Sequence, residues 1–154
     1  MKIEEEIHQK TFKTENQKAA INILFTANNM NINSFHILKE FGLTIPQFNI
    51  LRILRGQHPN SASINTLIER MLDKASNASR IVEKLREKNL VVRTTNAIDR
   101  RSVDVVITDA GLSVLAKIDV VEEEFHFGTD SLSQAEVMML NHLLDKGRTS
   151  IINF

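Results

Sequence analysis

The sequence predicts a mainly α-helical fold with one small β-hairpin, an α+β arrangement. Through most of the chain, apolar residues recur at the three- and four-residue spacing that places them on one side of a helix. The exception is residues 90–108, where two runs rich in β-branched residues stand on either side of a short polar stretch. Helical segments are expected both before and after this hairpin.

Capping signals indicate where the first helices begin. TENQ at 14–17 and TIPQ at 44–47 both fit the capping box, in which a hydroxyl and an amide side chain satisfy free backbone N–H groups. One helix is expected after the first box, with an apolar run at 19–25 that is expected to be buried. A second helical stretch, 32–41, ends before Gly42, and a third follows the second box to Gly56.

The middle of the chain is expected to hold a pair of helices and then the hairpin. A short helix begins at Ser63, and another runs from near Asp73 to Asn89, with Ala75 in its apolar stripe. Strands at 90–95 and 103–108 follow. The second strand alternates apolar and mixed positions, so one of its faces is expected to be buried.

The C-terminal part is expected to form two helices. Thr108 is the expected N-cap of a long helix, the segment HFGTD interrupts it, and SQAE at 133–136 is a third capping box. This order of elements, a helix pair followed directly by a two-stranded hairpin, is that of a winged helix-turn-helix. The second helix of such a pair normally enters the major groove of DNA.

The charge is distributed unevenly along the chain, which has 19 basic and 19 acidic residues. Residues 74–101 hold eight basic and three acidic side chains, a net charge of +5. Residues 1–73 have a net charge of +1 and residues 102–154 a net charge of −6. A basic middle segment on the parts that would face a duplex favours DNA binding, although charge also fluctuates by chance along a chain.

The polar face of the expected recognition helix, residues 74–88, carries side chains suited to reading bases. Asn pairs with an adenine edge, Arg with guanine, and Ser with either. The alternative is an ordinary solvated helix face. The DNA-contacting residues expected in the helix and the first strand are Lys74, Ser76, Asn77, Ser79, Arg80, Lys84 and Arg93.

The hairpin tip, NAIDRRS at 96–102, carries more charge than a turn needs. Arg100 and Arg101 are expected to contact DNA, and an arginine at the end of a β-ribbon can reach a narrow minor groove. Adjacent residues of an extended strand point to opposite sides, so one of the two is expected to insert while the other binds phosphate or pairs with Asp99. Asp99 either orients a guanidinium or only forms the turn.

The segment SNASRIVEKLREKNLVVRTTNAIDRRSVDVVITDAG, residues 76–111, resembles the recognition helix and wing of the MarR family of bacterial transcription regulators. GLTIPQFNILRIL at 42–54 is similar to the segment that precedes the helix-turn-helix in that family. One departure is Asn89, where the family commonly has Gly. Because Asn tolerates the same backbone conformation, only the helix cap is expected to be weakened.

The resemblance implies an obligate homodimer in which each lobe binds half of a pseudo-palindromic operator. It implies that Arg100 or Arg101 enters the minor groove while Asp99 holds the wing arginine. The family often binds small aromatic effectors, which makes Phe35, Phe41 and Phe48 a candidate effector pocket, with core packing as the alternative.

These observations predict three parts: N-terminal dimerisation helices at 1–43, a winged helix-turn-helix lobe at 44–109 and C-terminal dimerisation helices at 110–154. The expected function is that of a homodimeric repressor of transcription relieved by a small effector. The alternative is a winged-helix module for protein–protein contact without specific DNA readout. The identity of the effector stays open.

Other classes of protein are disfavoured. The chain has no cysteine, which excludes disulfides, thiol catalysis and cysteine-based zinc sites. No grouping of residues resembles a catalytic site, and the five histidines lack metal-ligand spacing, so neither an enzyme nor a cofactor is expected. The acidic start of the chain does not resemble a signal peptide and no apolar run would span a bilayer, so a cytoplasmic protein is expected.

Overall fold

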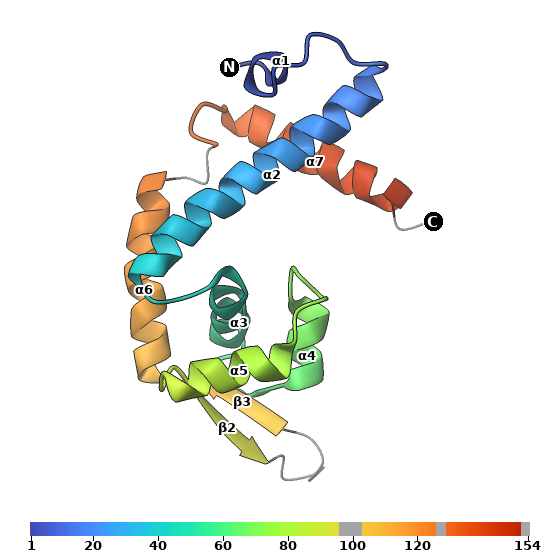
Figure 1. Ribbon diagram of the computed structural model, residues 1–154. Helices are drawn as coiled ribbons and strands as arrows, with labels where there is room; N and C mark the ends of the chain where they lie inside the picture. Colours follow the sequence, from blue (N-terminus) through green and yellow to red (C-terminus); the bar gives the residue numbers. More distant parts are fainter. Residues whose placement is uncertain (96–102, 126–128, 152–154) are drawn as a thin grey trace. The chain divides into compact units, whose positions relative to one another are not determined.

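A computed structural model describes residues 1–95, 103–125 and 129–151 (Figure 1). The fold is mainly helical with one small antiparallel sheet, as predicted. The helices are α1 (Ile3–Glu6), α2 (Glu15–Glu40), α3 (Ile45–Arg55), α4 (Ile64–Arg70), α5 (Ala78–Glu87), α6 (Asp109–Phe125) and α7 (Gln134–Ile151). The strands are β1 (Ala62–Ser63), β2 (Val91–Thr95) and β3 (Val103–Ile107). The chain divides into two compact units, Met1–Asp119 and Val120–Phe154.

Helix α2 is a single helix of 26 residues, so the expectation of two separate helical stretches was wrong. Its N-cap is as predicted: the Thr14 hydroxyl accepts a hydrogen bond from the Gln17 N–H at 3.1 Å. The asparagines in its middle lower helix propensity only slightly, which is not enough to interrupt a helix of this length. The apolar run at 19–25 is not buried as expected, because Ile23 is 52% and Leu24 70% exposed.

Helix α3 follows a sharp turn and forms the centre of the core. Gly42 adopts the left-handed backbone conformation, with φ of 65°, as expected for the residue after a helix. Thr44 and Gln47 form the complete capping box, with Thr44 Oγ1 accepting from the Gln47 N–H and Gln47 Oε1 accepting from the Thr44 N–H. Gly56 ends the helix in the right-handed conformation.

The sheet has the strand order β1-β3-β2 and both pairings are antiparallel. Strand β1 is only two residues long and gives no alternating pattern, so the sequence did not predict it. Val105 and Ile107 of β3 are buried, which confirms the apolar face expected of this strand. The largest fully buried side chains of the core are Ile50, Leu51, Leu54, Leu67, Val82, Leu85, Val91, Val105, Leu115 and Ile118.

Helix α6 begins where the hairpin ends. Thr108 is its N-cap as predicted, because Thr108 Oγ1 accepts from the Gly111 N–H at 3.1 Å. The Thr108 hydroxyl donates to the carbonyl of Asn89 at 2.9 Å, and Asn89 has the predicted left-handed conformation, with φ of 58°. This contact joins the end of the recognition-helix segment to the start of α6.

Helix α7 belongs to the second unit and begins at the third capping box. Glu136 Oε2 accepts from the Ser133 N–H at 2.8 Å and from the Ser133 hydroxyl at 2.7 Å. These hydrogen bonds lower the pKa of the Glu136 carboxyl. No helix in the described part of the chain is long and apolar enough to cross a membrane.

Candidate nucleic-acid interface

The turn before α5 is built by Asp73. Its carboxylate accepts from the Ala75 N–H at 3.0 Å and from the Ser76 hydroxyl at 2.6 Å. These hydrogen bonds, with the Ser76 hydroxyl as the largest cause, lower the pKa of Asp73. The turn is also fixed to α3, because the Leu72 N–H donates to Asn49 Oδ1 at 3.0 Å. Asp73 therefore closes a turn and does not begin the helix, which corrects the expected start near Asp73.

Asn77 begins helix α5 in place of Asp73. Its side-chain oxygen accepts from the Arg80 N–H at 3.0 Å, so Asn77 is the N-cap. Ala75, expected in the apolar stripe, lies in the turn and is exposed. Of the predicted DNA contacts, Ser76 is hydrogen-bonded within the turn and the Asn77 oxygen is held by the cap, which leaves the Asn77 amide nitrogen for a base.

Helix α5 buries one side and exposes the other. Ala78, Val82 and Leu85 are buried in the core, and α5 packs against α3, α4 and β2 (Figure 1). Ser79 and Arg80 are exposed, as is Lys74 in the preceding turn. Neither Lys74 nor Arg80 has an ion-pair partner among the described residues. This end of α5 therefore offers uncompensated positive charge together with small polar side chains.

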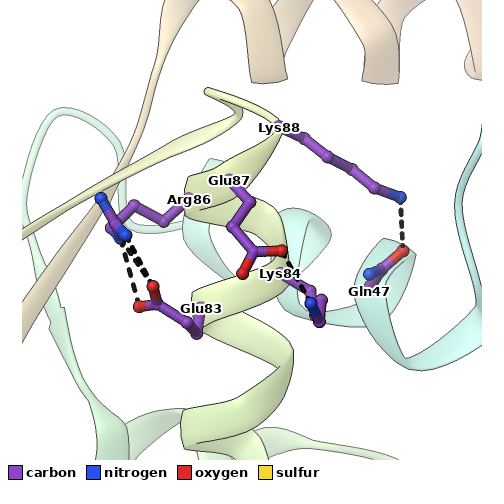
Figure 2. A network of polar contacts seen from close by, with 6 residues as sticks. All are labelled: Gln47, Glu83, Lys84, Arg86, Glu87 and Lys88. Carbon is purple, nitrogen blue, oxygen red and sulfur yellow. Dashed lines mark hydrogen bonds and ion pairs between the residues drawn. The ribbon is translucent and has the colours of Figure 1, made fainter.

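The second half of α5 carries cations that are paired with carboxylates (Figure 2). Lys84 Nζ lies 2.8 Å from Glu87 Oε2, and Arg86 Nη2 lies 2.6 Å from Glu83 Oε1. The hydrogen bonds from Arg86 lower the pKa of Glu83, and the same contact raises the pKa of Arg86. Both cations in this half of the helix, Lys84 and Arg86, thus carry partly neutralised charges.

Arg93 of β2 also reaches Glu83. Its Nη1 atom lies 3.6 Å from Glu83 Oε2. The strand register pairs Arg93 with Val105, and opposite residues in antiparallel strands project to the same face of the sheet. Since Val105 is fully buried, Arg93 stands on the core-facing side of the hairpin, at the edge next to α5.

Lys88 connects the end of α5 to the turn between α2 and α3. Its ammonium donates to the Gly42 carbonyl. It also donates to Gln47 Oε1 at 3.2 Å (Figure 2). The same Gln47 oxygen accepts from the Thr44 N–H, so one buried amide side chain serves both the cap of α3 and the end of α5. These contacts fix the position of α5 relative to α3.

Comparison with known proteins identifies this arrangement. A family model described as the MarR family matches residues 41–102, which span the helix-turn-helix and most of the hairpin. The HTH-type transcriptional regulator MgrA of Staphylococcus aureus is 26% identical over 110 residues, 71% of this chain and 73% of MgrA. The HTH-type transcriptional repressor IacR of Pseudomonas putida is 29% identical over 114 residues, 73% of this chain and 67% of IacR. Over residues 41–102 the chain is similar to the MarR family.

The fold agrees with that of a solved structure of a DNA-binding protein. The structure of BpsR from Bordetella bronchiseptica, described as regulated in its DNA binding by 6-hydroxynicotinic acid, has a TM-score of 0.75. It covers 90% of this chain and 98% of BpsR at 21% identity, so the likeness concerns the fold alone. The relatives that this chain resembles, MgrA and IacR, are transcription regulators and not enzymes.

The tip of the expected wing falls outside the described residues. Asp99, Arg100 and Arg101 belong to 96–102, so their expected roles in the minor groove stay predictions. The base of the wing is described as far as Thr95 and from Val103.

The three phenylalanines of the expected effector pocket lie in different surroundings. Phe48 is buried in the core, with the Arg52 guanidinium carbon 5.6 Å from its ring centre. Phe41 is half-buried and packs against the same core. Phe35 is 49% exposed and makes an edge contact with His36. The structure thus favours core packing for Phe48, and the pocket stays a prediction.

Sequence reasoning did not single out Glu83, Glu87 or Lys88. The spacing of three residues in Glu83–Arg86 and Lys84–Glu87 is a signal that could have found the two ion pairs on α5. The Arg93 and Lys88 contacts join residues far apart in the chain or in different elements, and no sequence pattern gives them. Among the described residues no group of three or more His, Asp and Glu side chains is placed to hold a metal ion.

Proposed function

We propose that the chain is a homodimeric transcription repressor that binds double-stranded DNA sequence-specifically and is released by a small effector. Helix α5 enters the major groove and the wing, residues 96–102, lies at the minor groove. The observation that carries this proposal is the first half of α5, where Ser79 and Arg80 are exposed on a helix whose opposite side is buried, with Lys74 exposed in the preceding turn.

The anchoring of α5 suits it for reading bases. A side chain discriminates between bases only if its backbone is held in one position, and α5 is held by its buried face, by the Asn77 cap and by Lys88. The first residues of a recognition helix go deepest into the groove. Arg80 can therefore reach a guanine edge or a phosphate, and Ser79 either a base or a phosphate.

Exposed apolar side chains support dimerisation through the parts outside the winged helix. Helix α2 exposes Ile23, Leu24, Met30, Ile32 and Phe35, and α7 exposes Met138, Met139, Leu140 and Leu143. Each of the two helices thus exposes several large apolar side chains, and apolar surface of this kind supports an interaction with another chain. A second copy of the chain is the proposed partner, with residues 1–43 and 110–154 forming the dimerisation part and 44–109 the DNA-binding lobe.

A dimer fixes the form of the operator. Two symmetry-related recognition helices read two half-sites of a pseudo-palindrome, with centres about 10 base pairs apart. The name of IacR supports repression as the sign of regulation, and the description of BpsR supports control by a small aromatic acid. A repressor of this kind acts in the cytoplasm, where the DNA is.

Fluorescence anisotropy with the duplex upstream of the chain's own coding region tests the proposal. We expect binding to this duplex at low salt that is tighter than to a random duplex and falls steeply as salt is raised. Arg80→Ala should weaken it at least several-fold. Arg148→Ala, which removes one positive charge from α7, is the matched control and should change it little.

Two outcomes would contradict the proposal. If no duplex binds at low salt, a winged-helix module for protein contact is the better description. If sedimentation at micromolar concentration finds only monomers, the dimeric form of the proposal is wrong.

A further inference from the structure

Glu83 and Glu87 lie on the side of α5 that would face DNA. They are four residues apart, which places them one above the other on the helix surface. This side is opposite to Ala78, Val82 and Leu85, which face the core. Arg80 shares the outward side, one turn before Glu83. The recognition helix thus presents two carboxylates to a polyanion.

These carboxylates hold cations that would otherwise be available to phosphates. Glu87 holds Lys84 at 2.8 Å, and Glu83 holds Arg86 at 2.6 Å (Figure 2). Glu83 also lies 3.6 Å from Arg93. Three basic side chains at the end of α5 and the base of the wing are therefore engaged by two acidic ones. Uncompensated charge among the described residues of α5 and its turn is left to Lys74, Arg80 and Lys88.

A contribution to helix stability does not explain the ion pair between Lys84 and Glu87. A glutamate is stabilising near the N-terminus of a helix and unfavourable near the C-terminus, where Glu87 is the last residue of α5. A lysine that precedes its glutamate is also the weaker order for a helical pair. Exposed ion pairs contribute little to folding in any case. The Glu83–Arg93 contact joins the helix to a strand, so it is not a helical pair at all.

We propose that Glu83 and Glu87 determine specificity by suppressing non-specific binding to DNA. The inference rests on the proposed function. Non-specific affinity comes almost entirely from cations that neutralise phosphates and release counterions. A cation that is paired with a carboxylate contributes less to the non-specific affinity for DNA, and the carboxylate itself is repelled by phosphate. The carboxylates do not affect base contacts from the first half of α5. They therefore lower the affinity for random sequences by a larger factor than the affinity for the operator.

The test uses the full-length chain with Glu83→Gln, Glu87→Gln and the double variant. Glutamine keeps the size of the side chain and removes its charge. Affinity for a random duplex and for an operator selected in vitro with wild-type protein is measured by fluorescence anisotropy over a series of salt concentrations. Circular dichroism confirms folding. Asp145→Asn is the matched control, because Asp145 pairs with an arginine three residues later on α7.

For the random duplex we expect each single variant to bind about 3- to 10-fold more tightly at low salt. The slope of log affinity against log salt should steepen by up to about 0.9 for each cation that gains a phosphate. Operator affinity should rise less, so the ratio of operator to random affinity falls. Asp145→Asn should leave this ratio unchanged.

Three results would overturn the inference while leaving the proposed function intact. The first is an unchanged affinity and salt slope on the random duplex. The second is an equal gain on both duplexes, which would make the carboxylates ordinary repulsive charges. The third is a loss of operator affinity with no gain on the random duplex, which would indicate that the carboxylates contact bases. Failure of the wild type to bind any duplex would instead overturn the proposed function, and the inference with it.

Discussion

Gly111 lies directly against the backbone carbonyl of Leu90. A Cβ atom built on Gly111 would overlap the Leu90 oxygen and would come within 2.7 Å of Cγ1 of Ile107. The same carbonyl accepts a hydrogen bond from the Thr108 N–H at 3.1 Å. The first turn of α6 therefore packs against the backbone at the start of the wing, and only glycine leaves room for this contact.

Gly111→Ala should destabilise the protein by about 1–3 kcal/mol, because the added methyl group meets a backbone atom that cannot move aside. Urea unfolding followed by circular dichroism measures the change. Gly147→Ala is the matched control: nothing lies within 4 Å of the Cβ position of this helical glycine. That variant should be neutral or stabilise by up to about 1 kcal/mol. Equal effects of the two substitutions would refute the steric argument.

Asn77→Ala should lower stability by about 1 kcal/mol, because it removes the N-cap of α5. It should also weaken binding to all duplexes, since the start of the recognition helix frays. Asn77→Ser keeps a capping oxygen and separates the two roles of the residue. If Asn77 also reads a base through its amide nitrogen, the serine variant keeps its stability and loses base preference at one operator position. Unchanged preference in the serine variant would limit Asn77 to the cap.

The sequence predicted the elements that depend on local chemistry. The capping residues Thr44, Ser63, Thr108 and Ser133 all begin helices as expected, since a side-chain oxygen next to free N–H groups acts within a few residues. The start of α5 was misjudged because Asp73 and Asn77 are both good caps. Which one begins the helix depends on the turn that Asp73 forms with Ser76 and on the Asn49 contact from α3.

Features that depend on packing were not predictable in the same way. Strand β1 is defined by the pairing of Ala62 and Ser63 with β3. A segment of two residues is too short to show a strand pattern in the sequence. The continuity of α2 depends on many weak propensities that the asparagines do not outweigh. The ionic contacts of Glu83 depend on the closeness of β2 to α5, so the basic segment could be recognised from sequence while its partial neutralisation could not.

Replacing both wing arginines, Arg100→Ala with Arg101→Ala, should abolish most operator binding and leave dimerisation intact. The salt slope should become shallower by about 0.9 for each phosphate that the wing no longer neutralises. Anisotropy measures binding, and sedimentation of the same samples measures the dimer. Operator affinity equal to that of the wild type would show that the wing does not contact DNA. The single variants then identify which arginine contributes more.

Lys88→Met should destabilise the protein by about 0.5–1.5 kcal/mol, because it removes the hydrogen bonds to the Gly42 carbonyl and to Gln47. Methionine keeps the apolar length of the side chain, so the loss reports on the ammonium group. Lys117→Met on α6 is the control, because Lys117 has no hydrogen bond or ion pair among the described residues. If both variants unfold at the same urea concentration, Lys88 does not fasten α5 to the turn.

The carboxyl of Glu83 should titrate below the ordinary range for a glutamate, because the hydrogen bonds from Arg86 lower its pKa and the charges of Arg93 and Lys84 lower it further. A pKa that is depressed by folding contributes stability above the ordinary carboxyl pKa. That contribution is lost as the pH falls through the lower, folded value.

Carboxyl carbon shifts in an NMR titration of the folded chain measure this directly. Arg86→Gln should raise the Glu83 pKa more than Arg93→Gln does, because Arg86 makes short hydrogen bonds and Arg93 only a contact at 3.6 Å. A larger shift from Arg93→Gln would mean that the wing strand, and not the helix, is the main partner of Glu83. In that case the main role of the Glu83 carboxylate would be to hold strand β2 against α5, and the neutralisation of Arg86 on the helix would be secondary.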